Sequence, residues 1–148
     1  MRNSLEIVFR SVLPVMFLLL LTSCSPKQKV VEERYPDGSP RNECLYKGTG
    51  EQRVLLKETF YYSNGQVEMT GAYKDGERDG YWIYYYENGN VWSEGFYNKG
   101  KNDGKRLTYF ENGRLRYEAY YKDNERTGVW KFWDQAGNLI KEVNYSGQ

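Results

Sequence analysis

The sequence predicts an all-β fold: an elongated single-layer antiparallel β-meander of tandem 24-residue hairpin repeats. Shifting the 148-residue chain by 24 residues superposes four glycines without a gap, at Gly65, Gly89, Gly113 and Gly137. Turn-forming pairs separate segments rich in aromatic and branched residues, such as 81–86 and 91–97, which have the length of an average strand. No stretch of the repeats shows a helical apolar period. A period in the twenties indicates units that bury apolar groups only against their neighbours.

The first 23 residues have the features of a secretory signal peptide. Two arginines precede an apolar run over 12–21, which is too short for the roughly 20 residues of a membrane-spanning helix. The run closes with Leu21-Thr22-Ser23-Cys24, which is similar to the bacterial lipobox, although an ordinary signal with an incidental cysteine is the alternative. We therefore expect lipid attachment at Cys24 and a bacterial envelope location. Ser25 resembles the sorting signal for an outer membrane.

The composition argues against nucleic-acid binding and catalysis. Without Arg2, Arg10 and Glu6, the 21 basic and 20 acidic side chains of the whole chain balance, so no basic surplus neutralises phosphates. Histidine is absent, which removes the usual base of nucleophilic catalysis and a common metal ligand. We expect no enzyme, no catalytic residue, no metal and no cofactor. Cys44 is expected to be a half-buried apolar residue.

Residues 24–34 are polar and lack periodicity, so they are predicted to be a tether. The repeat domain is predicted over 35–148. It begins with a degenerate repeat, and its five repeats are predicted at 35–59, 60–83, 84–107, 108–131 and 132–148. Eight or nine strands are expected, two in each repeat.

Two turn signals alternate along the repeats. The pairs Asn64-Gly65, Asn88-Gly89 and Asn112-Gly113 predict two-residue type I′ hairpin turns, which need positive φ at both central positions. A longer connection is expected to begin at Asp75-Gly76, Lys99-Gly100 and Asp123-Asn124. Although Asp75 begins an acidic turn, the position of the last EF-hand ligand is Tyr86, so we expect a solvated turn rather than a calcium site.

A two-residue turn at Asn88-Gly89 sets a register that divides the side chains between two faces. It pairs Tyr84 with Ser93 and Tyr85 with Trp92, which predicts one apolar packed face around Trp82. The opposite face then mixes aromatic and charged groups, a composition that suits partner binding. The candidate partner-binding residues on that face are Tyr85, Trp92, Tyr109, Arg116 and Trp133. Glutamates at 94, 118 and 142 recur once per repeat, which indicates a structural role.

The pattern Gly71-x-Tyr73-x-x-Gly76-x-x-x-Gly80 recurs as Gly95-x-Tyr97-x-x-Gly100-x-x-x-Gly104. It resembles the MORN repeat (membrane occupation and recognition nexus), and the added Tyr-Tyr-x-Asn-Gly is similar to its bacterial variant. The departures from this pattern are Arg106, Ala119 and Ala136. The resemblance implies elongated twisted sheets that act as interaction scaffolds without catalytic residues, and bacterial variants are described as antitoxin-like.

Together these observations predict a lipid-anchored envelope protein whose repeats bind an unknown protein partner. The alternatives are an antitoxin-like partner of a toxin, implied by the resemblance alone, and a cell-wall glycan-binding module that uses its aromatic side chains as stacking platforms.

Overall fold

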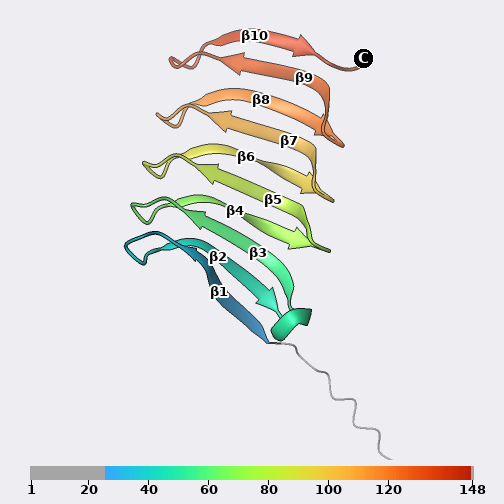
Figure 1. Cartoon of the computed structure of the whole chain (residues 1–148). Coiled ribbons are helices and arrows are strands. Elements are labelled where there is room, and N and C mark those ends of the chain that lie inside the picture. Colours follow the sequence, from blue (N-terminus) through green and yellow to red (C-terminus); the bar gives the residue numbers. More distant parts are fainter. Residues whose placement is uncertain (1–25, 148) are drawn as a thin grey trace, which may run out of the picture.

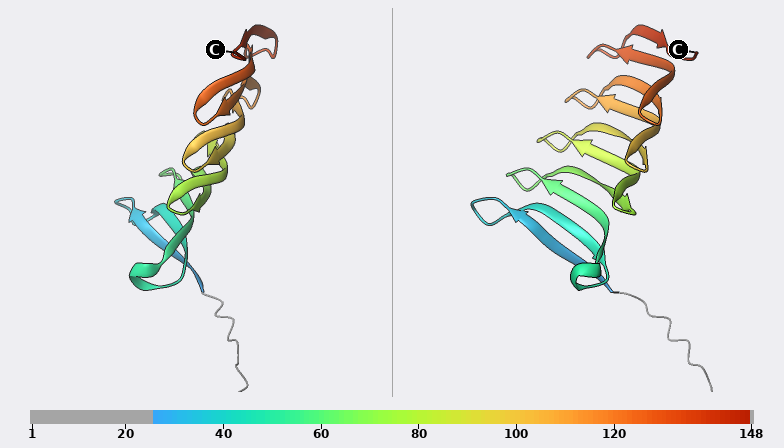
Figure 2. Two further views of the ribbon diagram at one scale, coloured as in Figure 1. Left: turned by 90° about the vertical axis from the view of Figure 1, so that its right-hand side faces the viewer. Right: turned by 45° about the vertical axis from the view of Figure 1, so that its right-hand side comes forward.

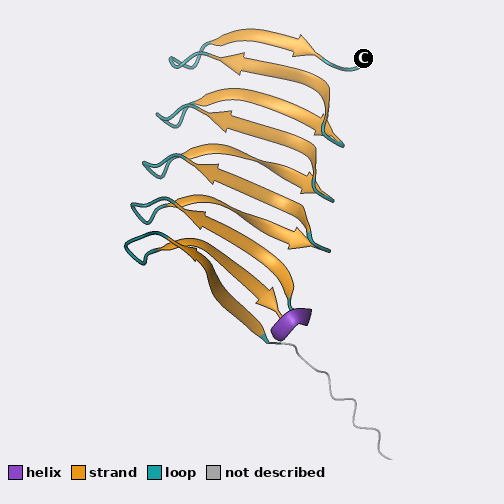
Figure 3. Ribbon diagram, in the orientation of Figure 1, coloured by secondary structure: helices purple, strands orange, loops and turns teal. Residues whose placement is uncertain are grey.

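Ten strands form one antiparallel sheet in strict chain order in the computed structural model, which describes residues 26–147 (Figure 1). The strands are β1 (Lys27–Arg34), β2 (Pro40–Lys47), β3 (Val54–Tyr61), β4 (Val67–Lys74), β5 (Glu77–Tyr85), β6 (Val91–Asn98), β7 (Lys101–Tyr109), β8 (Leu115–Lys122), β9 (Glu125–Trp133) and β10 (Leu139–Asn144). A single 3₁₀ turn, η1 (Gly50–Gln52), interrupts the described meander (Figure 3). The predicted all-β meander is confirmed.

Seen from its edge, the sheet is a thin twisted ribbon of stacked hairpins (Figure 2). Within the described part of the chain, no second layer covers either face. Twist of this kind follows from the handedness of the strands. Each side chain can therefore be buried only by neighbours on its own face, and both faces remain available for contacts.

The predicted tether is wrong for 27–34, because these residues form β1. Val30 pairs with Cys44 of β2, and Lys29 Nζ lies 2.8 Å from Glu43 Oε1. An edge strand of a single-layer sheet needs little apolar burial, so its polar composition concealed it. The first hairpin raises the strand count to ten. Residues 1–23 and Cys24 lie outside the described residues.

The two turn types are exchanged relative to the prediction. Gly89 has φ +86° and donates its N–H to the Tyr86 carbonyl at 2.9 Å, whereas Asn88 does not have positive φ. Tyr86 N–H also donates to the Asn90 carbonyl at 2.8 Å, so this loop has three residues and ends in a glycine bulge. The tight turns with positive φ at both central residues are Asp75-Gly76, Lys99-Gly100 and Asp123-Asn124.

Asparagine in the Asn-Gly pairs serves a different purpose from the predicted one. The Asn88 side-chain oxygen accepts the N–H of Asn90 at 2.9 Å, which closes the loop from the side. The amide of Asn64 donates to the Glu87 carbonyl of the next repeat at 3.0 Å. The asparagine therefore links stacked hairpins while its own backbone avoids the left-handed region.

A one-residue bulge follows each Asn-Gly loop. Tyr84 pairs with Ser93 as predicted, but Tyr85 pairs with Val91, which leaves Trp92 as the extra residue. The corresponding extra residues of the other hairpins are Glu68, Arg116 and Ile140. The predicted pairing of Tyr85 with Trp92 is therefore wrong.

Large aromatic side chains that pack over small residues provide the most buried apolar groups of the sheet. Trp82 is fully buried, and a Cβ placed on Gly71 would lie 2.1 Å from its Cδ2, so only glycine leaves room for the indole. The indole N–H donates to the Ala72 carbonyl at 3.0 Å. Trp130 repeats this arrangement in β9 and is 6% exposed.

Tyrosine hydroxyls connect successive repeats along the loop side of the sheet. Each donates to a backbone carbonyl of the next hairpin at 2.7–2.8 Å, in the pairs Tyr35 to Tyr61, Tyr62 to Tyr85 and Tyr86 to Tyr109. Phe110 occupies the next equivalent position and has no hydroxyl. The hydroxyl series therefore stops at the fourth hairpin.

Candidate functional site

The register defines two faces that differ in chemistry. We call the side that carries Trp82, Ser93, Arg106, Tyr117 and Trp130 the tryptophan face, and the side that carries Tyr85, Glu94, Tyr109, Glu118 and Trp133 the glutamate face.

The five predicted partner-binding residues do not share a face. Trp92 and Arg116 line a depression on the tryptophan face, whereas Tyr85, Tyr109 and Trp133 lie on the glutamate face. The prediction of one shared surface is wrong because each bulge adds a residue between the turn and the rest of the strand. A shift of one residue moves a side chain to the other face.

The depression on the tryptophan face has a volume of about 370 Å³ and is formed by β5, β6, β7 and β8. We call it the Trp92 hollow. Its lining consists of Tyr84, Trp92, Ser93, Arg106, Thr108, Arg116 and Tyr117. Ser93 and Thr108 are buried, and their hydroxyl oxygens lie 3.2 Å apart. The hollow thus combines aromatic side chains, hydroxyl groups and two arginines.

Trp92 is exposed but held in place by aromatic neighbours. Its side chain is 45% exposed, and its ring meets Tyr84 edge-on with centroids 6.0 Å apart. Tyr86 lies on another side at 6.4 Å. An aromatic side chain that is ordered before a partner arrives loses little conformational entropy on binding, which suits a contact residue.

Arg106 stands where the equivalent repeats carry Trp82 and Trp130. It donates to the Ser93 hydroxyl at 3.3 Å and to the Tyr97 hydroxyl at 3.1 Å. In the tryptophan-bearing repeats an arginine covers the indole: Arg78 lies 4.1 Å from the Trp82 ring centroid. In the Arg106 repeat, Asn102 replaces that covering arginine and accepts a hydrogen bond from Arg106. The exchange places a guanidinium beside the hollow.

Two tyrosines lie between the guanidinium groups of Arg78 and Arg106. Burial raises the pKa of Tyr84 to about 12, and its hydroxyl lies 3.3 Å from that of Tyr97. Burial alone would raise the pKa of Tyr97, but the hydrogen bond with Tyr84 and the charge of Arg106 outweigh it and lower that pKa. The two pKa values are therefore shifted in opposite directions within one hydrogen-bonded pair.

The polar groups of the glutamate face are paired with one another. Glu94 accepts hydrogen bonds from Tyr81 and, at 2.6 Å, from Tyr109. Glu118 forms an ion pair with Lys105 at 2.6 Å. The recurring glutamates thus have the structural role that their period predicts. Tyr109 is oriented by Glu94, and its pKa is raised first by burial and then by that carboxylate.

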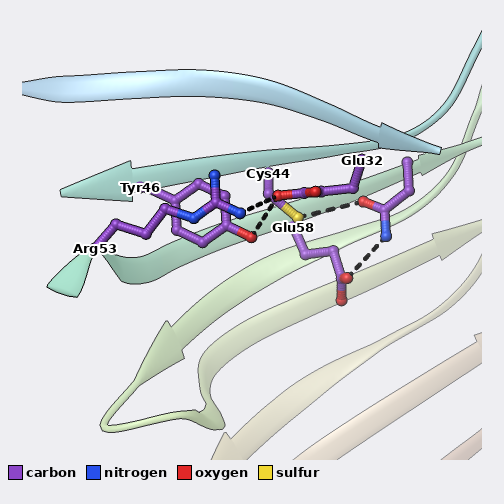
Figure 4. Close-up of polar contacts among 6 residues, drawn as sticks. Glu32, Cys44, Tyr46, Arg53 and Glu58 are labelled. Atoms are coloured by element: carbon purple, nitrogen blue, oxygen red, sulfur yellow. Dashed lines mark hydrogen bonds and ion pairs between the residues drawn. The ribbon is translucent and has the colours of Figure 1, made fainter. Parts of the chain in front are cut away.

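A second polar network joins β1, β2 and β3 (Figure 4). Glu32 accepts hydrogen bonds from Tyr46 and Arg53, both at 2.8 Å, and the Arg53 guanidinium lies 4.0 Å from the Tyr46 ring centroid. Cys44 is 3% exposed, donates to Asn42 at 3.4 Å, and has a pKa raised by burial. Its burial confirms a structural role, with an environment more enclosed than the expected half-buried one.

Residues 26–147 contain no group of three or more histidine, cysteine, aspartate or glutamate side chains arranged to hold a metal ion. In the same part of the chain, no helix has the length and apolarity needed to cross a membrane.

The sequence model of the MORN repeat variant matches four segments, at 56–75, 78–99, 102–123 and 126–146. These segments correspond to the hairpins β3–β4, β5–β6, β7–β8 and β9–β10, and they cover more than half of the chain. A search of curated proteins gives no match. The chain therefore belongs to the MORN repeat variant family, whose repeats form interaction or scaffold modules.

Proposed function

We propose that this chain is a non-catalytic, lipid-anchored protein of the bacterial envelope that acts as a protein–protein interaction scaffold. The tryptophan face is its contact surface. The observation that carries this assignment is the Trp92 hollow, where an exposed but ordered indole adjoins two arginines. Tryptophan, tyrosine and arginine are the residues that dominate the energetics of protein interfaces.

The size of the face supports a protein as the ligand. Ten strands spaced at about 4.8 Å give a sheet about 43 Å long, and eight-residue strands make it about 26 Å wide. One face therefore offers roughly 1,100 Å², more than the roughly 800 Å² that each partner buries in a standard interface.

The anchor supports a location at the membrane surface. Cys24 lies three residues before the start of β1 at Lys27. Acylation at this position would hold the sheet directly against the headgroups, because no long linker intervenes. The lipobox-like residues 21–24 support this part of the proposal, and two or three acyl chains are sufficient for stable attachment.

Fractionation of cells that express the chain tests the anchor. Wild-type protein should sediment with the membranes, whereas Cys24→Ala should move to the soluble fraction. An unchanged distribution of the variant would remove the anchor from the proposal.

Affinity capture from envelope extract tests the contact surface. Trp92→Ala and Phe96→Ala form a matched pair, because both side chains are about half exposed and they lie on opposite faces. Proteins that wild type and Phe96→Ala recover should be lost with Trp92→Ala. Equal recovery by all three proteins would count against the tryptophan face.

Binding of a cell-wall glycan is a second candidate, favoured by the exposed Trp92 ring above the buried hydroxyls of Ser93 and Thr108. Sugar rings stack on aromatic side chains and exchange hydrogen bonds with hydroxyls. Sedimentation with purified peptidoglycan that depends on Trp92 would favour this candidate. An antitoxin-like role has only the family resemblance behind it, and a toxin reading frame beside this gene would favour it.

A further inference from the structure

The two faces of β5–β10 differ sharply in charge. By the register, the aspartates and glutamates of these strands lie on the glutamate face; they are Glu77, Asp79, Glu94, Asp103, Glu118, Glu125 and Glu142. The lysines that pair with them are on the same side, as in Lys105–Glu118, Lys122–Asp103 and Lys131–Glu142. The glutamate face of these strands is therefore net acidic, because its seven carboxylates outnumber its four lysines, at 101, 105, 122 and 131.

The tryptophan face of the same strands carries only positive charge. Its arginines are Arg78, Arg106, Arg116 and Arg126. None of them has a carboxylate within 4 Å among the described residues, and each instead lies over an aromatic ring at 4.1–5.6 Å from its centroid. Arg78, Arg106 and Arg126 each donate some of their N–H groups to hydroxyl or amide oxygens, whereas Arg116 has no side-chain hydrogen bond within residues 26–147. The planar fork of a guanidinium matches a carboxylate, and that of Arg116 is entirely available for one.

We infer that this arginine row binds an extended acidic segment of a partner protein, with one carboxylate seated in the Trp92 hollow. This inference rests on the proposed protein-binding function and adds the chemistry of the partner. Arg106 and Arg116 flank the hollow, and the buried hydroxyls of Ser93 and Thr108 lie at its floor. The rings of Trp92 and Tyr117 offer contacts for an apolar side chain next to the carboxylate.

The spacing of the row sets the length of the segment. The arginines lie on β5, β7, β8 and β9, so the row crosses four interstrand steps of about 4.8 Å, or about 19 Å. An extended chain advances about 3.4 Å per residue, so about six residues cover the row. Side chains alternate along such a segment, which predicts acidic residues at every second position, with apolar residues between them.

Fluorescence anisotropy with the full mature chain tests this inference. The probe is a fluorescein-labelled hexapeptide that alternates aspartate or glutamate with leucine or phenylalanine, and its control replaces the acids by asparagine and glutamine. The acidic peptide should bind at least about tenfold more tightly than the amide control peptide, since a charge-assisted hydrogen bond contributes about one to two decades of affinity. Its affinity should fall as salt is added.

Variants assign the binding to the row. Arg116→Gln removes an exposed guanidinium and should weaken the acidic peptide about tenfold. Arg106→Lys keeps the charge but loses the planar fork, and it should also weaken binding. Lys105→Gln makes the same change of charge on the glutamate face and should leave the affinity unchanged. Thermal unfolding of each variant verifies that the fold is intact.

Three outcomes would overturn the inference. Equal affinity for the acidic and amide peptides would remove the charge requirement, and equal weakening by Lys105→Gln would remove the assignment to the tryptophan face. Alginate bound in place of the peptide, with the same dependence on Arg116, would assign the row to an acidic polysaccharide. If these tests fail while capture from envelope extract still depends on Trp92, the proposed scaffold function stands without an acidic partner.

Discussion

Replacing Trp82 by alanine removes the one large side chain that is completely buried among residues 26–147. The indole lies on Gly71, meets Tyr73 edge-on with centroids 5.4 Å apart, and lies under the Arg78 guanidinium at 4.1 Å. Its N–H also donates to the Ala72 carbonyl. Truncation of a buried tryptophan to alanine costs about 3–5 kcal/mol. Because a single-layer sheet lets water enter the space that is left, we expect a value near the lower limit, about 3 kcal/mol.

Urea unfolding followed by far-UV circular dichroism measures this loss. For a domain of this size, about 3 kcal/mol corresponds to a fall in Tm of roughly 12 °C. Trp92→Ala is the matched control, because it deletes the same side chain from a position that is 45% exposed, and it should cost no more than about 1 kcal/mol. Equal losses in the two variants would refute the claim that burial over glycine stabilises the sheet.

Three further predictions concern single groups. Phe110→Tyr supplies the missing hydroxyl, which should donate to the Trp133 carbonyl and raise the unfolding free energy by about 1 kcal/mol in urea titrations. Lys99 has φ +49°, so Lys99→Asn should raise Tm by a few degrees; no gain would contradict the tight turn. Lys105 lowers the pKa of Glu118 through a hydrogen bond, so this stabilisation is present above the unfolded pKa and lost as pH falls through the folded pKa. Urea unfolding should show Glu118→Gln less stable than wild type at pH 7 but equal to it near pH 2.

Features that repeat along the chain made most of the fold predictable. The four in-phase glycines fix the period, and alternating turns and strand-length segments fix a meander. β1 was missed because its composition is that of an exposed edge. Nothing in its sequence separates an exposed strand from a polar linker.

The local geometry of the Asn-Gly loops was less predictable than the meander, and it decides on which face of the sheet the neighbouring side chains lie. Asn-Gly suits both a two-residue turn and a three-residue loop closed by a glycine bulge. The choice depends on Asn64 and Asn88, whose amides also reach carbonyls of the following hairpin. That contact exists only once the hairpins are stacked, so no single hairpin reveals it. The resulting bulge moved Trp92 to the opposite face.

The site could be predicted in part. Trp92 and Arg116 were predicted as partner-binding residues of a face that mixes aromatic and charged groups, and both line the hollow, although it lies on the other face. Arg106 was noted as a departure from the repeat, since it replaces tryptophan, but it was not among the predicted partner-binding residues. The position of the Arg106 side chain depends on a second replacement, because Asn102 stands where the tryptophan-bearing repeats carry an arginine. The link between the two replacements is visible only in the structure, where Arg106 donates a hydrogen bond to Asn102.

Photocrosslinking in cells tests the central claim, that the tryptophan face is the contact surface. p-Benzoylphenylalanine is placed at position 92 in one variant and at position 96 in another, two exposed aromatic positions of β6 that point to opposite faces. We expect a discrete protein adduct from position 92 and none from position 96. An adduct from position 96 alone would contradict it and place the partner on the glutamate face.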